Sequence, residues 1–161
     1  MDAELTFRSY ARSDRRTCLR LFDLNSPRFF APNERRDYEE FLDDRPAGYE
    51  ICLAGGAPVG AFGLTGDEPA RRTLNWILID PGAQGAGIGT AMMRRAMARA
   101  RGLGLERLDI AASHLSAPFF ARFGAVVLSR TEDGWGPGMH RWDMELDLER
   151  GPDLPGPRLR R

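Results

Sequence analysis

The chain has 161 residues, 42% of them hydrophobic and 29% charged, which is the size and composition of one soluble globular domain. Its 23 basic and 23 acidic side chains cancel, and this excludes a general nucleic-acid binder, which needs a positive surplus. Every basic side chain is arginine. Without lysine, the chain can be neither a P-loop nucleotide hydrolase nor an enzyme with a Schiff-base lysine.

The N-terminal half of the sequence predicts two helices and four strands. Ser13 and Asp14 can cap the first helix and Asn33 the second, which Pro46 ends. Gly55-Gly56 has the composition of a hairpin turn. The expected elements are the strand Leu5–Ser9, the helices Arg15–Leu24 and Glu34–Asp44, and the strands Tyr49–Ala54, Pro58–Leu64 and Thr73–Ile79.

The second half begins with a glycine-rich turn, Pro81–Gly87, and an amphipathic helix over Ile88–Arg101. We interpret its methionine stripe as core, because methionine packs adaptably; the apolar arc holds Gly89, Met92, Met93, Ala96, Met97 and Ala100. The remaining elements are the strand Arg107–Ala112, the helix Ser116–Phe123 and the strands Ala125–Ser129 and Arg141–Leu148. This order predicts a mixed α/β single domain over residues 1–149, and the Pro/Gly-rich residues 150–161 are expected to be a disordered tail.

The cysteines and histidines predict neither a disulfide framework nor a metal site. Cys18 and Cys52 are too few for a cysteine scaffold, so we expect two reduced, buried thiols. His114 and His140 lack metal-ligand spacing. The N-terminus has no apolar core and no run approaches the roughly 18 apolar residues of a membrane span, so we expect a cytoplasmic protein.

The most informative segment is a buried strand that runs through a glycine loop into a helix. Glycines stand at positions 82, 85, 87 and 89. Free amides and the positive end of the dipole at a helix N-terminus favour a phosphate, and glycines let the phosphate come close. A dinucleotide fingerprint would need a third glycine where Thr90 stands.

The loop Gln84-Gly85-Ala86-Gly87-Ile88-Gly89 resembles the acyl-CoA-binding motif Q/R-x-x-G-x-G/A of the GCN5-related N-acetyltransferase (GNAT) superfamily. SHLSAPFFARFGA, residues 113–125, is similar to the family's late helix, and RWDMELDL, residues 141–148, to its closing strand. The resemblance implies an α/β fold with a mixed, mostly antiparallel sheet and helices on both faces.

The same resemblance implies acetyl-CoA as co-substrate. The backbone of Ile77, Leu78 and Ile79 would pair with the pantetheine arm, while their side chains pack in the core. Loop amides from Gly85 to Thr90 would hold the pyrophosphate. The implied cofactor-binding residues are therefore Ile77, Leu78, Ile79, Gln84, Gly85, Ala86, Gly87, Ile88, Gly89 and Thr90.

The sequence offers fewer candidates for catalytic residues than for cofactor-binding residues. Asp109 aligns with a strand position where some relatives carry a glutamate base, and its alternative is a salt-bridged strand carboxylate. Ser113 and His114 are alternatives for a position that contacts the cofactor or donates a proton. Phe120 stands where many relatives place a proton-donating tyrosine. Asp67 and Glu68 could attract a cationic acceptor or be plain solvated loop residues.

The resemblance predicts an N-acetyltransferase that moves an acetyl or short acyl group to a primary amine, on a small molecule or peptide, by direct attack on the thioester. The alternative is a non-catalytic acyl-CoA-binding module, because Phe120 has no proton to give. Neither nucleic acid nor membrane is expected as a partner, and a homodimer is the assembly common among similar proteins. Phe29 and Phe30 could line the acceptor pocket or anchor two helices.

Overall fold

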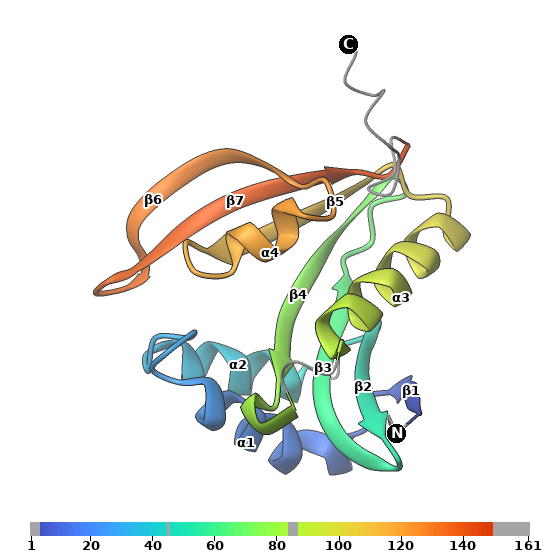
Figure 1. Cartoon of the computed structure of the whole chain (residues 1–161), viewed down its shortest axis with the longest axis vertical. Helices are drawn as coiled ribbons and strands as arrows, with labels where there is room; N and C mark the ends of the chain where they lie inside the picture. The colour runs from blue at the N-terminus through green and yellow to red at the C-terminus, as the bar shows by residue number, and fades with distance from the viewer. Residues whose placement is uncertain (1–3, 45, 84–86, 150–161) are drawn as a thin grey trace.

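The computed structural model describes residues 4–44, 46–83 and 87–149 (Figure 1). Its strands are β1 (Leu5–Ser9), β2 (Tyr49–Ala54), β3 (Ala57–Thr65), β4 (Arg71–Ile79), β5 (Arg107–Ser113), β6 (Val126–Gly136) and β7 (Met139–Asp147). Its helices are α1 (Arg15–Asn25), α2 (Glu34–Asp43), α3 (Ile88–Gly102) and α4 (Ala117–Ala121), with short 3-10 turns at Arg12–Asp14 and Pro81–Ala83. The expected tail over residues 150–161 lies outside the described residues.

The seven strands form one sheet in the order β1-β2-β3-β4-β5-β7-β6. Every neighbouring pair is antiparallel except β4 and β5, which run parallel. The parallel pair β4 and β5 is joined by a crossover connection that contains α3. This is the mixed, mostly antiparallel sheet that the sequence predicts.

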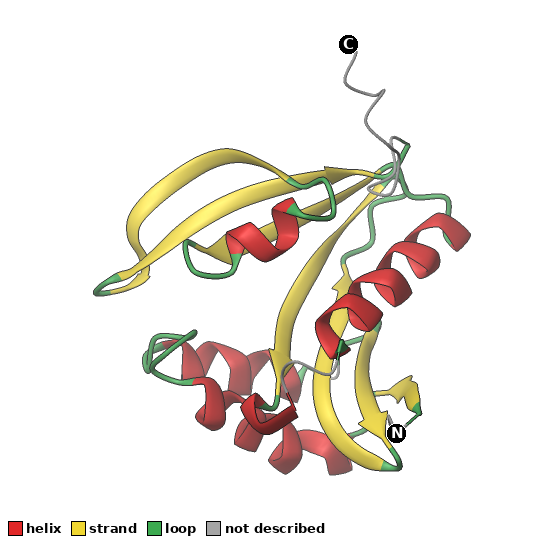
Figure 2. Ribbon diagram, in the orientation of Figure 1, coloured by secondary structure: helices red, strands yellow, loops and turns green. Residues whose placement is uncertain are grey.

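Helices cover both faces of the sheet, as expected (Figure 2). The alternation of side chains along β2 sorts them into two separate cores. Ile51 packs in a cluster with α1 and α2, whereas its neighbour Cys52 packs in a cluster with α3 and α4. Both cysteines are free and buried, as the sequence predicts, and burial raises the pKa of each thiol to about 11.

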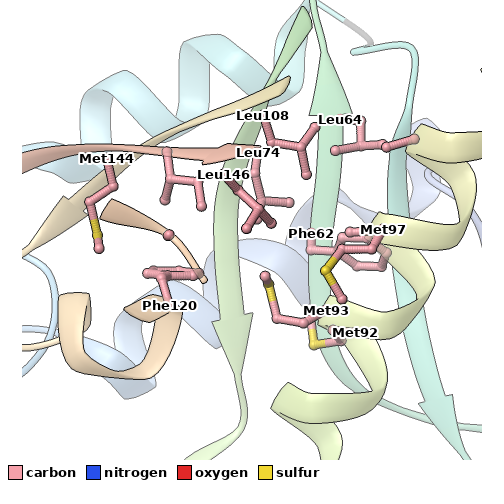
Figure 3. Packing of buried hydrophobic residues seen from close by; sticks show 14 of the residues in the cluster. Phe62, Leu64, Leu74, Met92, Met93, Met97, Leu108, Phe120, Met144 and Leu146 are labelled. Atoms are coloured by element: carbon pink, nitrogen blue, oxygen red, sulfur yellow. The ribbon is translucent and has the colours of Figure 1, made fainter. Parts of the chain in front are cut away.

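The α3 side of the sheet carries the larger core (Figure 3). The methionine stripe is confirmed as core, since Met92, Met93 and Met97 are each at most 3% exposed. They pack against Phe62 and Leu108 of the sheet, while Phe120 of α4 lies in the same cluster. This core anchors the N-terminal end of α3 beside the end of β4.

The α1–α2 side is an aromatic core built around three buried hydroxyl and carbonyl groups. Tyr38 and Tyr49 share a hydrogen bond of 2.8 Å between their hydroxyls, and Tyr49 donates to the Trp76 carbonyl at 2.6 Å. Burial raises the pKa of both tyrosines well above the ordinary value, so both hydroxyls stay protonated. The chain of donors fixes the backbone of β4 at Trp76.

At Trp76 the strand β4 contains one extra residue. Ala61 pairs with Leu78 and Gly63 with Asn75, so one β3 residue faces two β4 residues. Trp76 has a φ of 45°, a conformation that a bulky side chain adopts only where its surroundings enforce it. The pairing and the φ together define a β-bulge.

The bulge changes which face of the sheet the side chains at alternate positions of β4 point to. Leu74 packs in the α3-side core and Leu78 in the α1-side core. Residues four apart would share a face in a regular strand, so the extra residue accounts for the switch. Beyond the bulge, Ile77 and Ile79 turn toward α3 and Trp76 toward α1 and α2.

The last hairpin differs from the sequence-based prediction. β6 was expected to end at Ser129 but continues to Gly136, where it pairs with Met139. Its outer residues are mostly exposed and polar, so no apolar alternation marks the extension. Among the described residues, no helix has the length and apolar character needed to cross a bilayer.

Leu108 offers a test of the larger core. It is fully buried in β5, so Leu108→Ala should lower the free energy of unfolding by about 2–5 kcal/mol. Leu128 of β6 is 61% exposed, and the same change there should cost less than about 0.5 kcal/mol. Urea unfolding of both variants measures the difference; equal losses would contradict the assignment of Leu108 to the core.

Candidate active site

The parallel strands β4 and β5 part soon after they begin. Within the described chain they pair only from Arg71 with Arg107 to Leu74 with Ile110. Figure 1 shows the two strands diverging from their common end. From Asn75 onward, no described strand lies beside the edge of β4 that faces away from β3. The Trp76 and Ile79 carbonyls accept hydrogen bonds from the Tyr49 hydroxyl and the Asn25 amide, and backbone groups of this edge without such a partner could pair with a ligand.

A pocket of about 690 Å³ fills this split. Its wall combines β4 and β5 with the start of α3, with α4, and with the segment between α1 and α2. That volume is ordinary for a site that takes a small ligand or a cofactor arm. The pocket thus connects an end at α3, where the sequence predicts the cofactor and which we call the cofactor end, with a second end at α1 and α2.

The cofactor end is built by the N-terminus of α3. Gly87 is its N-cap with a φ of 76°, which a glycine adopts without strain. The first helical hydrogen bond runs from the Ala91 N–H to the Gly87 carbonyl at 3.0 Å. The amides of Ile88, Gly89 and Thr90 precede it, so the helix itself gives them no acceptor.

Six of the ten residues expected to bind the cofactor line this pocket: Ile77, Ile79, Gly87, Ile88, Gly89 and Thr90. Leu78 does not line it, because its side chain lies in the α1-side core and is 1% exposed. Gln84, Gly85 and Ala86 fall outside the described residues. Their roles and that of Leu78 stay predictions.

The second end of the pocket has aromatic walls. Phe29 and Phe30 line it from the segment between α1 and α2, and Trp76 lines it from β4; Phe30 also stacks on Trp76 with 6.0 Å between ring centroids. Trp135 of β6 lines it from the hairpin, and its indole N–H donates to the Ala112 carbonyl at 2.9 Å. Phe30 therefore serves as both pocket wall and packing anchor, whereas Phe29 lines the pocket.

The hairpin β6–β7 is fastened to the segment between α1 and α2. The Asn33 amide donates to the Trp135 carbonyl at 2.7 Å. Gly136 lies so close that a Cβ there would stand 2.4 Å from the Asn33 side-chain oxygen. These contacts hold the hairpin, and with it Trp135, beside the second end of the pocket.

Glu34, the first residue of α2, lines the same end and is 4% exposed. One carboxylate oxygen, Oε2, accepts the Ala31 N–H at 2.8 Å. Burial raises the pKa of Glu34 from its ordinary 4.5 to about 7, and the nearby charge of Asp37 adds to the rise. The sequence analysis missed this residue, since a glutamate after Asn33 is also the usual first turn of a solvated helix.

Asp109 lies outside the pocket lining. Its carboxylate accepts two hydrogen bonds from Arg71, one of them at 3.0 Å from Nε, and Arg71 also donates to Glu145 at 2.7 Å. The two carboxylates raise the pKa of Arg71 above its ordinary value. This geometry is that of the salt-bridged alternative, and the role of Asp109 as a base stays a prediction.

Ser113 and His114 are placed differently. Ser113 lines the pocket, but its hydroxyl accepts the amides of Leu115 and Ser116 at 3.2 and 3.1 Å and so closes the turn into α4. The His114 ring lies against His140, 4.6 Å between centroids, and does not line the pocket. Phe120 lines the pocket and is 6% exposed. Asp67 and Glu68 are exposed loop residues away from it.

Comparison with known families decides what kind of protein has this split sheet. The model of the acetyltransferase (GNAT) family matches residues 18–125, more than half of the chain. The chain belongs to the GNAT family. The resemblance inferred from the glycine loop and the late helix is confirmed, and GNAT membership supports acetyl transfer from acetyl-CoA in general.

Solved structures share the GNAT fold. One from Desulfovibrio desulfuricans, assigned to the GNAT family, is 21% identical and covers 90% of this chain and 99% of its own, with a TM-score of 0.74. The ribosomal-protein-S18-alanine N-acetyltransferase of Escherichia coli is 14% identical over 90% and 94%, with a TM-score of 0.75. A Salmonella typhimurium structure with its cofactor acetyl-CoA is 14% identical over 91% and 95%, with a TM-score of 0.66. No curated protein matches the sequence.

The buried carboxyl of Glu34 makes the stability of this GNAT protein depend on pH. Because the pKa of Glu34 is higher in the folded state, the native protein keeps a proton that the unfolded chain has already released. The free energy of unfolding therefore decreases as the pH rises from about 4.5 to about 7. Glu34→Gln removes this loss, so the variant should be more stable than the wild type by roughly 1–3 kcal/mol at about pH 8. At about pH 4.5 the two should nearly coincide. Urea unfolding at both pH values measures this, and a difference that does not change with pH would contradict it.

Proposed function

We propose that the protein is an N-acetyltransferase that moves the acetyl group of acetyl-CoA to a primary amine by direct attack on the thioester. Family membership supports the acetyl transfer, and the pocket supports its geometry. The observation that carries the proposal is the edge of β4 without a strand partner, which lies in one pocket between the amides of α3 and an aromatic end beside Glu34.

In this proposal the cofactor lies along β4. The pantetheine arm would take the place of the missing strand neighbour, using backbone groups near Ile77, Leu78 and Ile79. The pyrophosphate would be held by the amides of Gly85 to Thr90, with Gln84 at the loop entrance. The thioester then points toward the aromatic end, where an acceptor can enter.

The chemistry requires a neutral amine at the thioester carbon. The amine nitrogen attacks the carbonyl carbon, a backbone N–H of β4 near Leu78 stabilises the oxyanion, and the C–S bond breaks as the amide forms. CoA leaves as a thiolate, which is tolerable without an acid because a thiol pKa is about 8.5. Phe120 cannot donate a proton, and His114 lies outside the pocket lining, so solvent or Ser113 supplies it in this scheme.

The role of the α3 N-terminus can be tested with two glycines of the same φ. Gly87 and Gly104 both have a φ of 76° and open space where a Cβ would stand, one before α3 and one after it. Valine at either position should cost a similar strain of about 1–2 kcal/mol. Only Gly87 lines the pocket, so Gly87→Val alone should abolish the rise in melting temperature that CoA causes.

Isothermal titration of CoA into both variants checks the same point directly. Gly104→Val should bind CoA like the wild type, which shows that strain at the ends of α3 is harmless. Unchanged CoA affinity in Gly87→Val would mean that the loop is only a connection.

Turnover separates an enzyme from a non-catalytic acyl-CoA-binding module. Phe120 in the pocket is the observation that favours the module. Release of free thiol from acetyl-CoA should accelerate when a panel of primary amines is added, and the N-acetyl product should appear by mass spectrometry. Binding of CoA without thiol release for any amine would establish the module instead.

A further inference from the structure

We infer that Glu34 binds the acceptor's ammonium group and accepts its proton, and that the acceptor is a primary amine carried on an apolar body without a neighbouring carboxylate. This inference rests on the proposed function, since it names the residue and the substrate class that complete the same site. It assigns the amine-binding step to α2 rather than to the sheet.

Charge within the pocket points to Glu34. Among the described residues that line it, Glu34 is the one carboxylate, and no salt bridge to it is found in the described chain. Two arginines line the same pocket, Arg122 from α4 and Arg141 from β7. Arg141 is already paired with Asp143 at 2.9 Å and lies over the Trp135 ring at 4.9 Å. Neither arginine is found in a salt bridge with Glu34 within the described chain, so the Glu34 carboxylate is free to pair with the cation of a ligand.

The Glu34 carboxylate is also oriented. The Ala31 N–H holds Oε2 at 2.8 Å, and within the described chain no hydrogen bond reaches Oε1. A carboxylate buried to 4% exposure without an ion partner is costly, and an incoming ammonium would relieve that cost. Burial at the same time makes Glu34 a stronger base than an exposed glutamate, because its pKa stands at about 7.

The walls around Glu34 indicate the body of the acceptor. Phe29, Phe30, Trp76 and Trp135 present aromatic surface to the same end of the pocket. Aromatic faces favour both an apolar chain and an ammonium group. A carboxylate next to the amine would instead lie close to Glu34 and be repelled. The site thus fits an arylalkyl or alkyl amine better than an α-amino acid.

The proton balance of the step is complete. Glu34 takes one proton from the ammonium, which leaves a neutral amine whose lone pair forms the C–N bond. The C–S bond breaks as the tetrahedral intermediate collapses, and its electron pair leaves with the CoA sulfur. The second nitrogen proton passes to that thiolate through solvent, and Glu34 returns its own proton to solvent after product release.

The test compares Glu34→Gln with Glu40→Gln, using 2-phenylethylamine as acceptor. Glutamine can still accept the Ala31 N–H but can neither pair with an ammonium nor take its proton. Glu40 is on the same helix, its side chain is 69% exposed, and it lies outside the pocket lining. We expect a fall of about 10²–10⁴-fold in kcat/KM for Glu34→Gln and less than about twofold for Glu40→Gln. The CoA-dependent rise in melting temperature should be the same in both.

A pH profile of the wild type tests the base without any variant. The charge of Asp37 on the same helix acts on Glu34, Arg122 and Arg141 line the same pocket, and the lining parts of β4 and β5 carry no titratable side chain. With Glu34 as base, kcat/KM should level off above about pH 7, the pKa of Glu34, although the amine is still protonated. Without it, kcat/KM should keep rising tenfold per pH unit to the pKa of the amine, about 10.

The outcomes are distinct. If the wild type acetylates no amine, the proposed function fails. If it acetylates 2-phenylethylamine, but Glu34→Gln stays within about threefold or the wild-type profile shows no plateau, the role of Glu34 is overturned while the function stands. Phenylalanine, the same body with an added carboxylate, should be the poorer substrate. Preference for phenylalanine would assign the acceptor's carboxylate to Arg122 or Arg141 and overturn the proposed class.

Discussion

The single extra residue at Trp76 is the constraint on which the site depends. It turns β4 so that one strand contributes to the α3-side core before the bulge and to the α1-side core after it. Such a strand cannot stay in register with a flat parallel partner, and β5 leaves it at Leu74. The split, the free backbone edge and the pocket through the sheet are all consequences of that turn.

A strained residue persists only where its neighbours hold it. Both hydrogen bonds and apolar contacts keep Trp76 in this conformation. The Trp76 carbonyl accepts the Tyr49 hydroxyl, which in turn meets Tyr38, and the Trp76 ring packs among Phe22, Phe30 and Tyr38. Because Phe30 and Trp76 also form the pocket wall, the same contacts that stabilise the bulge shape the acceptor end.

Local sequence patterns were sufficient for most of the elements and for the family to which the chain belongs. The methionine stripe of α3, the glycine loop and the apolar strand before it each carry their signal in consecutive residues. The acceptor end does not, since it depends on Glu34, Trp76 and Trp135 meeting from α2, β4 and β6. No spacing rule relates such residues, and the burial that distinguishes Glu34 from an ordinary first-turn glutamate arises only on packing. Asp109 is a residue that the sequence did single out. Its alignment with a family base could not reveal that Arg71 donates hydrogen bonds to its carboxylate.

The hairpin that carries Trp135 affects how the sequence of this protein can evolve. β6 is exposed along most of its length and takes little part in either core, whereas α3 and the cofactor end are embedded in the methionine cluster. Substitutions at the exposed residues of β6 would therefore cost little folding free energy while changing the hairpin that carries Trp135. Under the proposed function, such changes would alter the acceptor side of the pocket and leave the α3 side as it is.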